Sequence, residues 1–396
     1  MAEPKALSTE LIHHPYRAPA GFMAPQPGVY KASTVIFPNV AALQARNWRE
    51  KSGYTYGLHG TPTTFLLEER IATLEGGCDT LLVPSGLAAI TLVDMALLKS
   101  GDEVLIPDNA YGPGKELARQ ELSRWGITHR FYDPADPQAL AAMISPQTRL
   151  LWLEAAGSIT MEFPDLRALV RVARAKGVPT ALDNTWGAGV AFNAFDLGEG
   201  LGVDISVHAL TKYPSGGGDV LMGSVTTRDH ELHLRLKATH MRMGWGVGLN
   251  DVEAVLRALP SLPLRYAAQD AAGRALAQWC TRQPQIVQVL HPALDTSPGH
   301  AHWQQLCTQA AGLFSVHFDP ALGREAVHSF VDALKLFKLG YSWAGPVSLA
   351  VPYELSQVRP GTHWRGTLVR FSLGLEDVRD LQADLQQALQ AVRWNG

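Results

Sequence analysis

The stretch Leu182-Asp183-Asn184-Thr185-Trp186 and the later stretch Ala209-Leu210-Thr211-Lys212-Tyr213 decide how this chain is interpreted. Each follows or ends a short apolar run, Thr180 to Asp183 and Ile205 to His208, that predicts a β-strand. The first strand ends on an aspartate, and a lysine comes shortly after the second. We therefore expect a carboxylate and an amine to meet at one edge of a sheet.

Asp183 and Lys212 are the pair that pyridoxal phosphate chemistry requires. An aspartate can keep the pyridine nitrogen protonated through a charge-assisted hydrogen bond, which makes the ring an electron sink. A lysine that is neutral in an apolar turn can form a Schiff base with the aldehyde of the cofactor. Either residue alone would more often be a cap, a turn residue or a surface charge. Their pairing favours the cofactor.

A phosphate site is predicted where Val83-Pro84-Ser85-Gly86-Leu87 passes from a strand into a helix. The amides of Gly86 and Leu87 can point at a dianion there, and Ser85 belongs to the same turn. Thr211, adjacent to the lysine, is a candidate hydroxyl donor to this phosphate. Taken alone the Ser-Gly turn is weak evidence, because an ordinary loop explains it equally well.

Apolar strands alternate with helical segments over much of the chain, which indicates an α/β protein with a mostly parallel sheet sandwiched by helices. Ligands of such sheets bind beyond the carboxyl ends of the strands. The chain places Ser85, Glu154, Asp183 and Lys212 at those ends. The predicted strands are 79–83, 103–106, 149–154, 180–183 and 205–208, and the predicted helices are an amphipathic one from about 61 to 75, then 87–99, 114–125 and 165–176.

Three parts are expected along the chain. Residues 1–60 contain many prolines and predict an extended arm that contacts a neighbouring subunit. Residues 61–258 would form the large, cofactor-binding domain, and residues 259–396 a smaller α/β domain. The smaller domain has predicted helices at 264–280 and 378–392 and strands at 313–317, 347–350 and 368–373, with Leu381, Leu385 and Leu389 as core residues.

The amino-acid composition argues against several classes of function. The 396 residues carry 34 basic and 37 acidic side chains, without a long run of either sign, so nothing favours nucleic acid or an anionic membrane as a partner. Three cysteines and the scattered histidines lack metal-ligand spacing, so we expect no metal and no disulfide framework. No signal peptide and no membrane-spanning apolar stretch is visible. We expect a cytoplasmic protein with a small-molecule substrate.

The motifs together resemble the Cys/Met-metabolism family of pyridoxal phosphate enzymes, which have the fold type I architecture. The resemblance covers nearly the whole chain, and its β-lyase branch is the most similar. The general motifs are Tyr54 to Thr63, Leu74-Glu75-Gly76-Gly77, Ser85-Gly86-Leu87, Tyr111-Gly112, Glu154, Asp183 to Trp186, Thr211-Lys212-Tyr213 and Arg370 to Asp377. Those typical of the β-lyase branch are Gly157 to Glu162, Trp186 and Tyr341-Ser342-Trp343.

The resemblance implies roles for further residues. Tyr111 would stack on the pyridine ring, and Tyr56 would reach the phosphate or substrate of the neighbouring subunit. Arg370 would clamp the substrate carboxylate. Ser342 and Trp343 would shape the substrate pocket. The family also implies a homotetramer built from dimers.

The implied activity is a carbon–sulfur β-lyase that cleaves L-cystathionine to homocysteine, pyruvate and ammonia, with a cofactor held as an aldimine on Lys212. Lys212, Tyr111 and Tyr56 would be the catalytic residues. Cystine and other cysteine S-conjugates are further candidate substrates. A cystathionine γ-synthase, a γ-lyase or a methionine γ-lyase would use the same cofactor residues, and a catalytically silent regulatory protein would usually have lost the lysine or the aspartate.

Two positions depart from the pattern of the family. Leu58, followed by His59, stands where many relatives have an arginine, and Gly216-Gly217-Gly218-Asp219 replaces the usual Gly-His-Ser-Asp. A phosphate cation is therefore missing or replaced, for which His59 or backbone amides are candidates.

Overall fold

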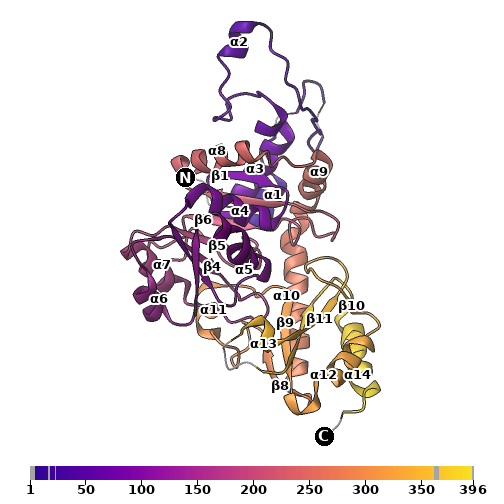
Figure 1. The fold of residues 1–396 in the computed structure, drawn as a ribbon. Coiled ribbons are helices and arrows are strands. Elements are labelled where there is room, and N and C mark those ends of the chain that lie inside the picture. Colours follow the sequence, from indigo (N-terminus) through magenta and orange to yellow (C-terminus); the bar gives the residue numbers. More distant parts are fainter. Residues whose placement is uncertain (1–4, 17, 23, 361–364, 395–396) are drawn as a thin grey trace.

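The protein folds around two sheets, as a computed structural model that describes residues 5–16, 18–22, 24–360 and 365–394 shows (Figure 1). The larger sheet has the strand order β1-β7-β6-β5-β4-β2-β3. β7 runs antiparallel to both of its neighbours, and the other pairs are parallel. The strands are β1 Asp79–Val83, β2 Glu103–Pro107, β3 Thr128–Tyr132, β4 Thr148–Glu154, β5 Thr180–Asp183, β6 Ile205–His208 and β7 Gly223–Thr227.

Neighbouring residues along these strands pack into two separate hydrophobic cores, one on each face of the sheet. Leu105 of β2 packs into one, and Val104 and Ile106 on either side of it pack into the other. Side chains alternate across a strand, so a sheet with helices on both faces needs continuous apolar strands. The expected mostly parallel α/β sheet is confirmed. Its helical segments are α3 Pro62–Glu75, α4 Gly86–Leu97, α5 Gly112–Leu117, η2 Ala118–Leu122, α6 Pro137–Met143, α7 Leu166–Ala175, α8 His230–Met243, α9 Leu249–Ala258 and η3 Leu259–Ser261.

The second sheet has the order β10-β11-β12-β9-β8 and is mainly antiparallel. A third core lies beside it, where the predicted core residues Leu381, Leu385 and Leu389 of the closing helix are buried. The domain boundaries at 60 and 258 stay a prediction. The elements of this part are α10 Leu262–Cys280, β8 Ile286–Leu290, α11 His300–Leu306, β9 Leu313–Phe318, η4 Pro320–Leu322, α12 Arg324–Asp332, β10 Lys338–Leu339, β11 Leu349–Glu354, α13 Leu355–Val358, β12 Thr367–Ser372 and α14 Val378–Ala391.

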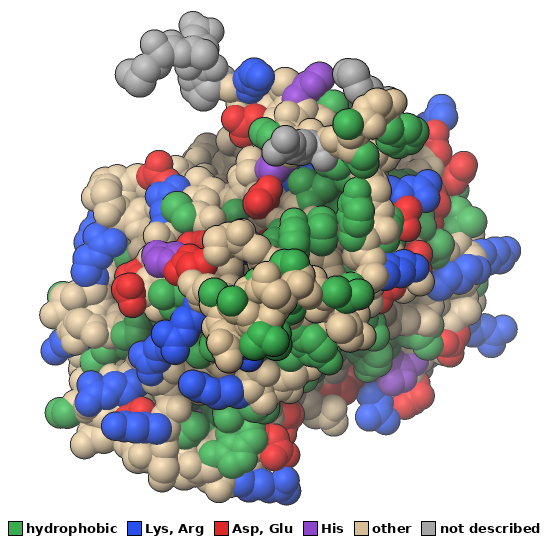
Figure 2. All heavy atoms as spheres, turned by 90° about the horizontal axis from the view of Figure 1, so that it is seen from above, with side chains coloured by type: hydrophobic (Ala, Val, Ile, Leu, Met, Phe, Trp, Pro, Cys, Tyr) green, Lys and Arg blue, Asp and Glu red, His purple; other side chains and the backbone are tan. Residues whose placement is uncertain are grey.

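The N-terminal arm is only partly extended. Its first helix, α1 (Leu7–Ile12), packs on α3 and η3, and Leu11 is fully buried. The short helix α2 (Val40–Gln44) instead stands away from the sheets at the top of Figure 1. Ile36, in the same segment, is 91% exposed. Figure 2 looks down on this end and shows hydrophobic side chains gathered near the middle of the face.

The helix predicted to be amphipathic is buried on almost every side. Of the residues in α3, even Glu68, Arg70 and Glu75 are buried. The helix is covered by β1 and β7 on one side and by α9 and α1 on the other. The prediction of an amphipathic face was wrong because the elements that cover α3 come from distant parts of the chain.

Several elements carry too little periodicity to be predicted. β3, at the sheet edge, is exposed or half-buried except at Tyr132, and β7 is the polar sequence Gly-Ser-Val-Thr-Thr although all five residues are buried. The strand predicted at 347–350 lies instead at β11, Leu349–Glu354. Neighbouring strands supply the hydrogen bonds that hold β7, and single-sequence patterns do not contain that information.

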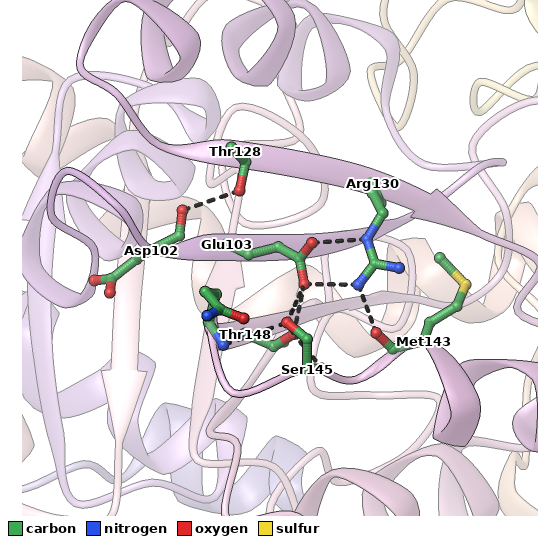
Figure 3. A network of polar contacts seen from close by, with 8 residues as sticks. Asp102, Glu103, Thr128, Arg130, Met143, Ser145 and Thr148 are labelled. Atoms are coloured by element: carbon green, nitrogen blue, oxygen red, sulfur yellow. Dashed lines mark hydrogen bonds and ion pairs between the residues drawn. The ribbon is translucent and has the colours of Figure 1, made fainter.

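A polar network links the amino ends of β2 and β4 to the neighbouring strand β3 (Figure 3). Arg130 Nε and Nη2 donate to the two carboxylate oxygens of Glu103 over 2.7 and 2.8 Å. Thr148 Oγ1 donates to the same carboxylate over 2.6 Å. The network lies at the edge of the sheet opposite to Asp183 and Lys212, because Glu103 and Thr148 begin β2 and β4, and Arg130 reaches them from the middle of β3. None of the helices in the described residues combines the length and hydropathy needed to cross a membrane.

One carboxylate lies inside the apolar core. Asp94 of α4 is 2% exposed, and Trp152 Nε1 donates a hydrogen bond to its Oδ1 over 2.9 Å. Burial raises the pKa of Asp94 to about 7, although the hydrogen bond from Trp152 opposes the shift. The neutral acid is therefore the form that the core accommodates.

We expect Asp94→Asn to remove part of the pH dependence of stability. Because the folded pKa is raised, stabilisation by neutral Asp94 is complete below the ordinary value of 3.8 and is lost as pH rises through about 7. That loss amounts to at most about 4 kcal/mol. Asparagine keeps the acceptor for Trp152 and cannot ionise, so its advantage in thermal unfolding should grow with pH.

The control is Asp332→Asn, at an exposed position of α12. A melting-temperature difference between Asp94→Asn and the wild type that stays constant from about pH 5 to about pH 8 would contradict the assignment.

Candidate active site

The carboxyl edge of the larger sheet brings the predicted residues together. Glu154 and Asp183 end adjacent strands, where they are register partners. Asp183 is in turn paired with Val207 of β6, the strand that leads into the turn with Lys212. Parallel strands end at the same edge, so the strand order itself assembles these side chains.

Asp183 is held by its own local turn. Its Oδ1 accepts hydrogen bonds from the amide and the hydroxyl of Thr185, over 3.0 and 2.5 Å. The Thr185 hydroxyl also accepts from the amide of Ala209 over 2.9 Å, which links the turn after β5 to the turn after β6. Burial raises the pKa of Asp183 and the two bonds from Thr185 lower it. A cationic donor at Oδ2 would stabilise the ionised form.

One buried glutamate connects α3, the turn after β5 and strand β6. Glu75, the last residue of α3, accepts hydrogen bonds from Asn184 Nδ2 over 2.9 Å and from Ser206 Oγ over 2.7 Å. His208 Nδ1 lies 2.8 Å from its other carboxylate oxygen. The side chain of Glu75 is completely buried. Glu75 belongs to the motif Leu74-Glu75-Gly76-Gly77, but no local sequence pattern indicates this role.

The Lys212 amine contacts Ser342 and Trp343, which belong to the same part of the chain as the second sheet. Its Nζ donates to Ser342 Oγ over 2.7 Å and lies 5.5 Å from the centre of the Trp343 ring. Burial, followed by the charge of Arg370, lowers the pKa of Lys212 to about 8. At pH 7 about a tenth of the molecules then have the neutral amine that a nucleophile or base requires, far more than at an ordinary lysine.

The loop that meets Lys212 is conformationally strained. Ser342 has a φ of 125° and Ala344 a φ of 62°, both in the region that favours glycine. Trp343 packs against Tyr213 at 5.7 Å between ring centres, and the hydroxyl of Tyr213 accepts from the amide of Gly312 over 2.8 Å. Strain of this kind persists where packing holds it and is concentrated at functional sites.

Arg370 comes from the middle of β12 and is buried. Its guanidinium lies 5.5 Å from the centre of the Tyr353 ring, and Nη1 is 3.4 Å from the carbonyl oxygen of Ser158. Burial lowers the pKa of Arg370, but the group stays charged. In the part of the chain that the structure describes, this buried guanidinium contacts no carboxylate, so it is suited to an anionic ligand.

Tyr111 caps α5 at the same edge. Its amide donates to Glu154 Oε2 over 2.8 Å, and its side chain is partly open, since the residue is 42% exposed. Burial, Asp183 and Glu154 all raise the pKa of Tyr111. The phenol is therefore neutral and can offer its ring face to a flat ligand.

The phosphate turn has the geometry of an anion site. Ser85 caps α4, and its Oγ accepts from the amide of Ala88 over 3.1 Å. The amides of Gly86 and Leu87, in the first turn, have no acceptor within the helix. A side chain at Gly86 would come within 2.6 Å of Ala209 Cβ, so glycine is required for this close approach.

Two further predicted residues have other surroundings within the single chain. The Thr211 hydroxyl donates to the carbonyl of Met222 and accepts from its amide, so a phosphate contact would have to replace or share these bonds. Tyr56 is 46% exposed and lines a pocket with His59, Lys237 and His240. The role predicted for Tyr56 at the site of a neighbouring subunit stays a prediction.

The donors and acceptors at this edge fit pyridoxal phosphate. Asp183 keeps Oδ2 available for a ring nitrogen, Lys212 offers an amine of lowered pKa, and the start of α4 offers amides for a phosphate. Among the described residues, no group of three or more His, Cys, Asp or Glu side chains could hold a metal ion.

A family model described as Cys/Met metabolism PLP-dependent enzyme matches residues 8–390. The chain belongs to this family. It is thus an enzyme with the fold type I architecture and uses pyridoxal phosphate. A crystal structure of metB from Corynebacterium glutamicum is similar to the chain, with a TM-score of 0.89 and 27% identity over 98% of both chains.

Members of the family that are similar in sequence have several names. A cystathionine beta-lyase of Bordetella avium is 39% identical over 91% of this chain and 90% of its own length. Cystathionine beta-lyase MetC of Escherichia coli is 34% identical over 96% and 97%. An L-methionine gamma-lyase of Pseudomonas putida and an L-alanine/L-glutamate racemase of Wolbachia pipientis are 33% and 32% identical.

We expect Glu75→Gln to destabilise the fold by about 3 kcal/mol, because a buried carboxylate with three donors is replaced by an amide that matches them poorly. Glu69→Gln, at an exposed position of the same helix, is the control. Denaturant midpoints measure the loss. Equal midpoints for the two variants would show that the buried network contributes little.

The pH dependence of cofactor attachment should report the amine of Lys212. Attachment to the apo-protein, trapped by borohydride and counted by mass spectrometry, should accelerate with pH around a midpoint of about 8. Arg370→Gln removes a like charge and should move the midpoint upward. Arg379→Gln, exposed on α14, is the control. A wild-type midpoint near the ordinary lysine value of 10.5 would contradict this.

Proposed function

We propose that the enzyme is a carbon–sulfur β-lyase that cleaves L-cystathionine to homocysteine, pyruvate and ammonia. The observation that carries the proposal is the Lys212 amine, held by Ser342 Oγ at 2.7 Å and lying beside the ring of Trp343. Ser342 and Trp343 belong to the motif typical of the β-lyase branch, and the relatives named cystathionine beta-lyase support the same reaction.

When bound, pyridoxal phosphate supplies an electron sink for the negative charge that develops at Cα of the substrate. Lys212, neutral above its pKa of about 8, removes the proton from Cα. The resulting ammonium then donates a proton to the sulfur that leaves Cβ. One amine thus serves as base and then as acid, and β-elimination requires no proton abstraction from Cβ.

The other residues hold the reactants in place. Arg370, from β12, would bind the α-carboxylate of the substrate, and Tyr111 would stack on the cofactor ring. Asp183 accepts the hydrogen bond of the protonated ring nitrogen, while Ser85, Gly86, Leu87 and Thr211 bind the phosphate. Since an anionic Asp183 is costly when unpaired, the ring cation and the carboxylate stabilise each other.

The proposal includes a homotetrameric assembly and a location in the cytoplasm. The exposed apolar arm, with Ile36 and Val40 in solvent in a single chain, supports a homotetramer in which Tyr56 serves the site of a neighbouring subunit.

The three cysteines are free, which agrees with the reducing environment of the cytoplasm. Cystine and other cysteine S-conjugates are included as substrates, because the β-elimination needs only a leaving sulfur.

One relative is named an L-methionine gamma-lyase, so the product has to decide between β-elimination and γ-elimination. We expect purified enzyme to release pyruvate from cystathionine, and little 2-oxobutyrate from methionine or homocysteine. Lys212→Ala should abolish both pyruvate release and covalent retention of the cofactor, because no other amine replaces the base at Cα.

Arg379→Gln serves as a variant outside the site. The proposal fails if 2-oxobutyrate is the main product, or if Lys212→Ala releases pyruvate at the wild-type rate. Racemisation of alanine or glutamate without pyruvate formation would instead favour the racemase named among the relatives.

A further inference from the structure

Arg359 links the second sheet region to two loops of the larger sheet. It follows α13, and its side chain is 7% exposed. Nη2 donates to both carboxylate oxygens of Asp108 over 2.8 Å, and Nη1 donates to Glu162 Oε1. One planar guanidinium therefore holds two carboxylates from different loops, a task for which arginine is better suited than lysine.

The first of these loops ends at Tyr111. Asp108 follows β2 directly, and its amide donates to the carbonyl of Tyr132 over 2.9 Å. Lys115 Nζ donates to the carbonyl of Asp108 over 2.7 Å and to that of Val358 over 3.4 Å. The loop is thus held at Asp108 by Arg359 and at Tyr111 by Glu154. A displacement of Asp108 would be passed on to Tyr111.

The second loop runs from Gly157 to Glu162 and folds back on itself. The amide of Gly157 donates to the carbonyl of Glu162 over 2.9 Å, and Thr160 Oγ1 donates to its carboxylate. Asn109 Nδ2 donates to Glu162 Oε2 over 3.3 Å, and the amide of Ser158 donates to the Asn109 carbonyl over 3.0 Å. The two loops therefore form one hydrogen-bonded unit.

This unit also contacts the predicted carboxylate-binding residue. The carbonyl of Ser158 faces Arg370 Nη1 at 3.4 Å, and the carbonyl of Ile159 accepts from Ser315 Oγ over 2.7 Å. A side chain at Gly157 would come within 2.4 Å of Asn109 Nδ2, so the loop can pack this closely only with glycine there. Arg359 is thus connected to both Tyr111 and Arg370 through the hydrogen bonds of the two loops.

We propose that Arg359 is a positioning residue that sets the ring of Tyr111 and the guanidinium of Arg370 relative to each other by clamping Asp108 and Glu162. The inference rests on the proposed function for the roles of Tyr111 and Arg370. Without the guanidinium, two carboxylates would face each other unneutralised, and both loops would relax.

The surroundings of Arg359 make substitution feasible. Arg359, Asp108 and Glu162 lie on the wall of a cavity of about 950 Å³. A shorter side chain at 359 therefore opens onto space that water can fill, and it does not create an apolar void.

The same strand offers a matched control. Arg130 makes a bidentate pair with Glu103, which begins β2, whereas Asp108 follows the end of β2 (Figure 3). Arg130→Gln removes a forked ion pair from the end of β2 that is remote from Tyr111 and Arg370. It therefore reports what the loss of such a pair does to stability alone.

The test compares Arg359→Gln, Arg359→Lys and Arg130→Gln in the full-length protein. Cofactor affinity is measured by absorbance titration of the apo-proteins with pyridoxal phosphate, and KM and kcat are measured with cystathionine. Arg359→Gln should raise the cofactor dissociation constant and KM each about tenfold or more. Arg359→Lys keeps the charge without the fork and should lie between, while Arg130→Gln should stay within about twofold of the wild type.

A purely structural Arg359 would lower the melting temperature and leave the cofactor dissociation constant and KM within about twofold of the wild type, which would overturn the proposal. If Arg359→Gln does not fold, Arg359→Lys and Asp108→Asn decide by the same two constants, and wild-type values in both would overturn it. Wild-type protein that binds the cofactor but releases no pyruvate would defeat the proposed function alone, because the cofactor titration still tests Arg359.

Discussion

The burial of the Glu75 carboxylate is the constraint on which the site depends. Asn184, Ser206 and His208, from the strands or turns of β5 and β6, converge on it. A buried carboxylate must be satisfied, so these contacts stabilise the packing of α3 against the two strands. The same two strands lead to Asp183 and to the turn with Lys212.

Burial is the largest cause of the pKa shifts at Lys212 and Asp183. The pKa of Lys212 falls because the amine is buried and lies near Arg370, and the pKa of Asp183 rises because its carboxylate is buried. Both shifts disfavour the charged form of the group concerned. A ligand with a ring cation and a carboxylate supplies the missing opposite charges, so the protein accepts an energetic cost that binding relieves.

Two distant regions of the chain complete this arrangement. Ser342 reaches Lys212 from a strained loop after β10, and Arg359 reaches Asp108 and Glu162 from the end of α13. Each contact crosses between the two sheet regions. The geometry around the amine and around Tyr111 therefore depends on how these regions dock, and single substitutions at the docking surface can act on the site without touching a ligand.

The sequence by itself determined the parallel core and the chemistry-bearing pair. Continuous apolar runs such as 180–183 and 205–208 predict strands buried on both faces, and an aspartate and a lysine after them indicate the cofactor. It also carried the family motifs around Trp343 and Arg370. Only the tertiary structure decided that α3 is buried on nearly all sides, that polar β7 belongs inside the sheet, and that Glu75 and Arg359 support the site. The physical reason is that burial and ion pairing depend on partners more than a hundred residues away, and local periodicity records only a residue's own face.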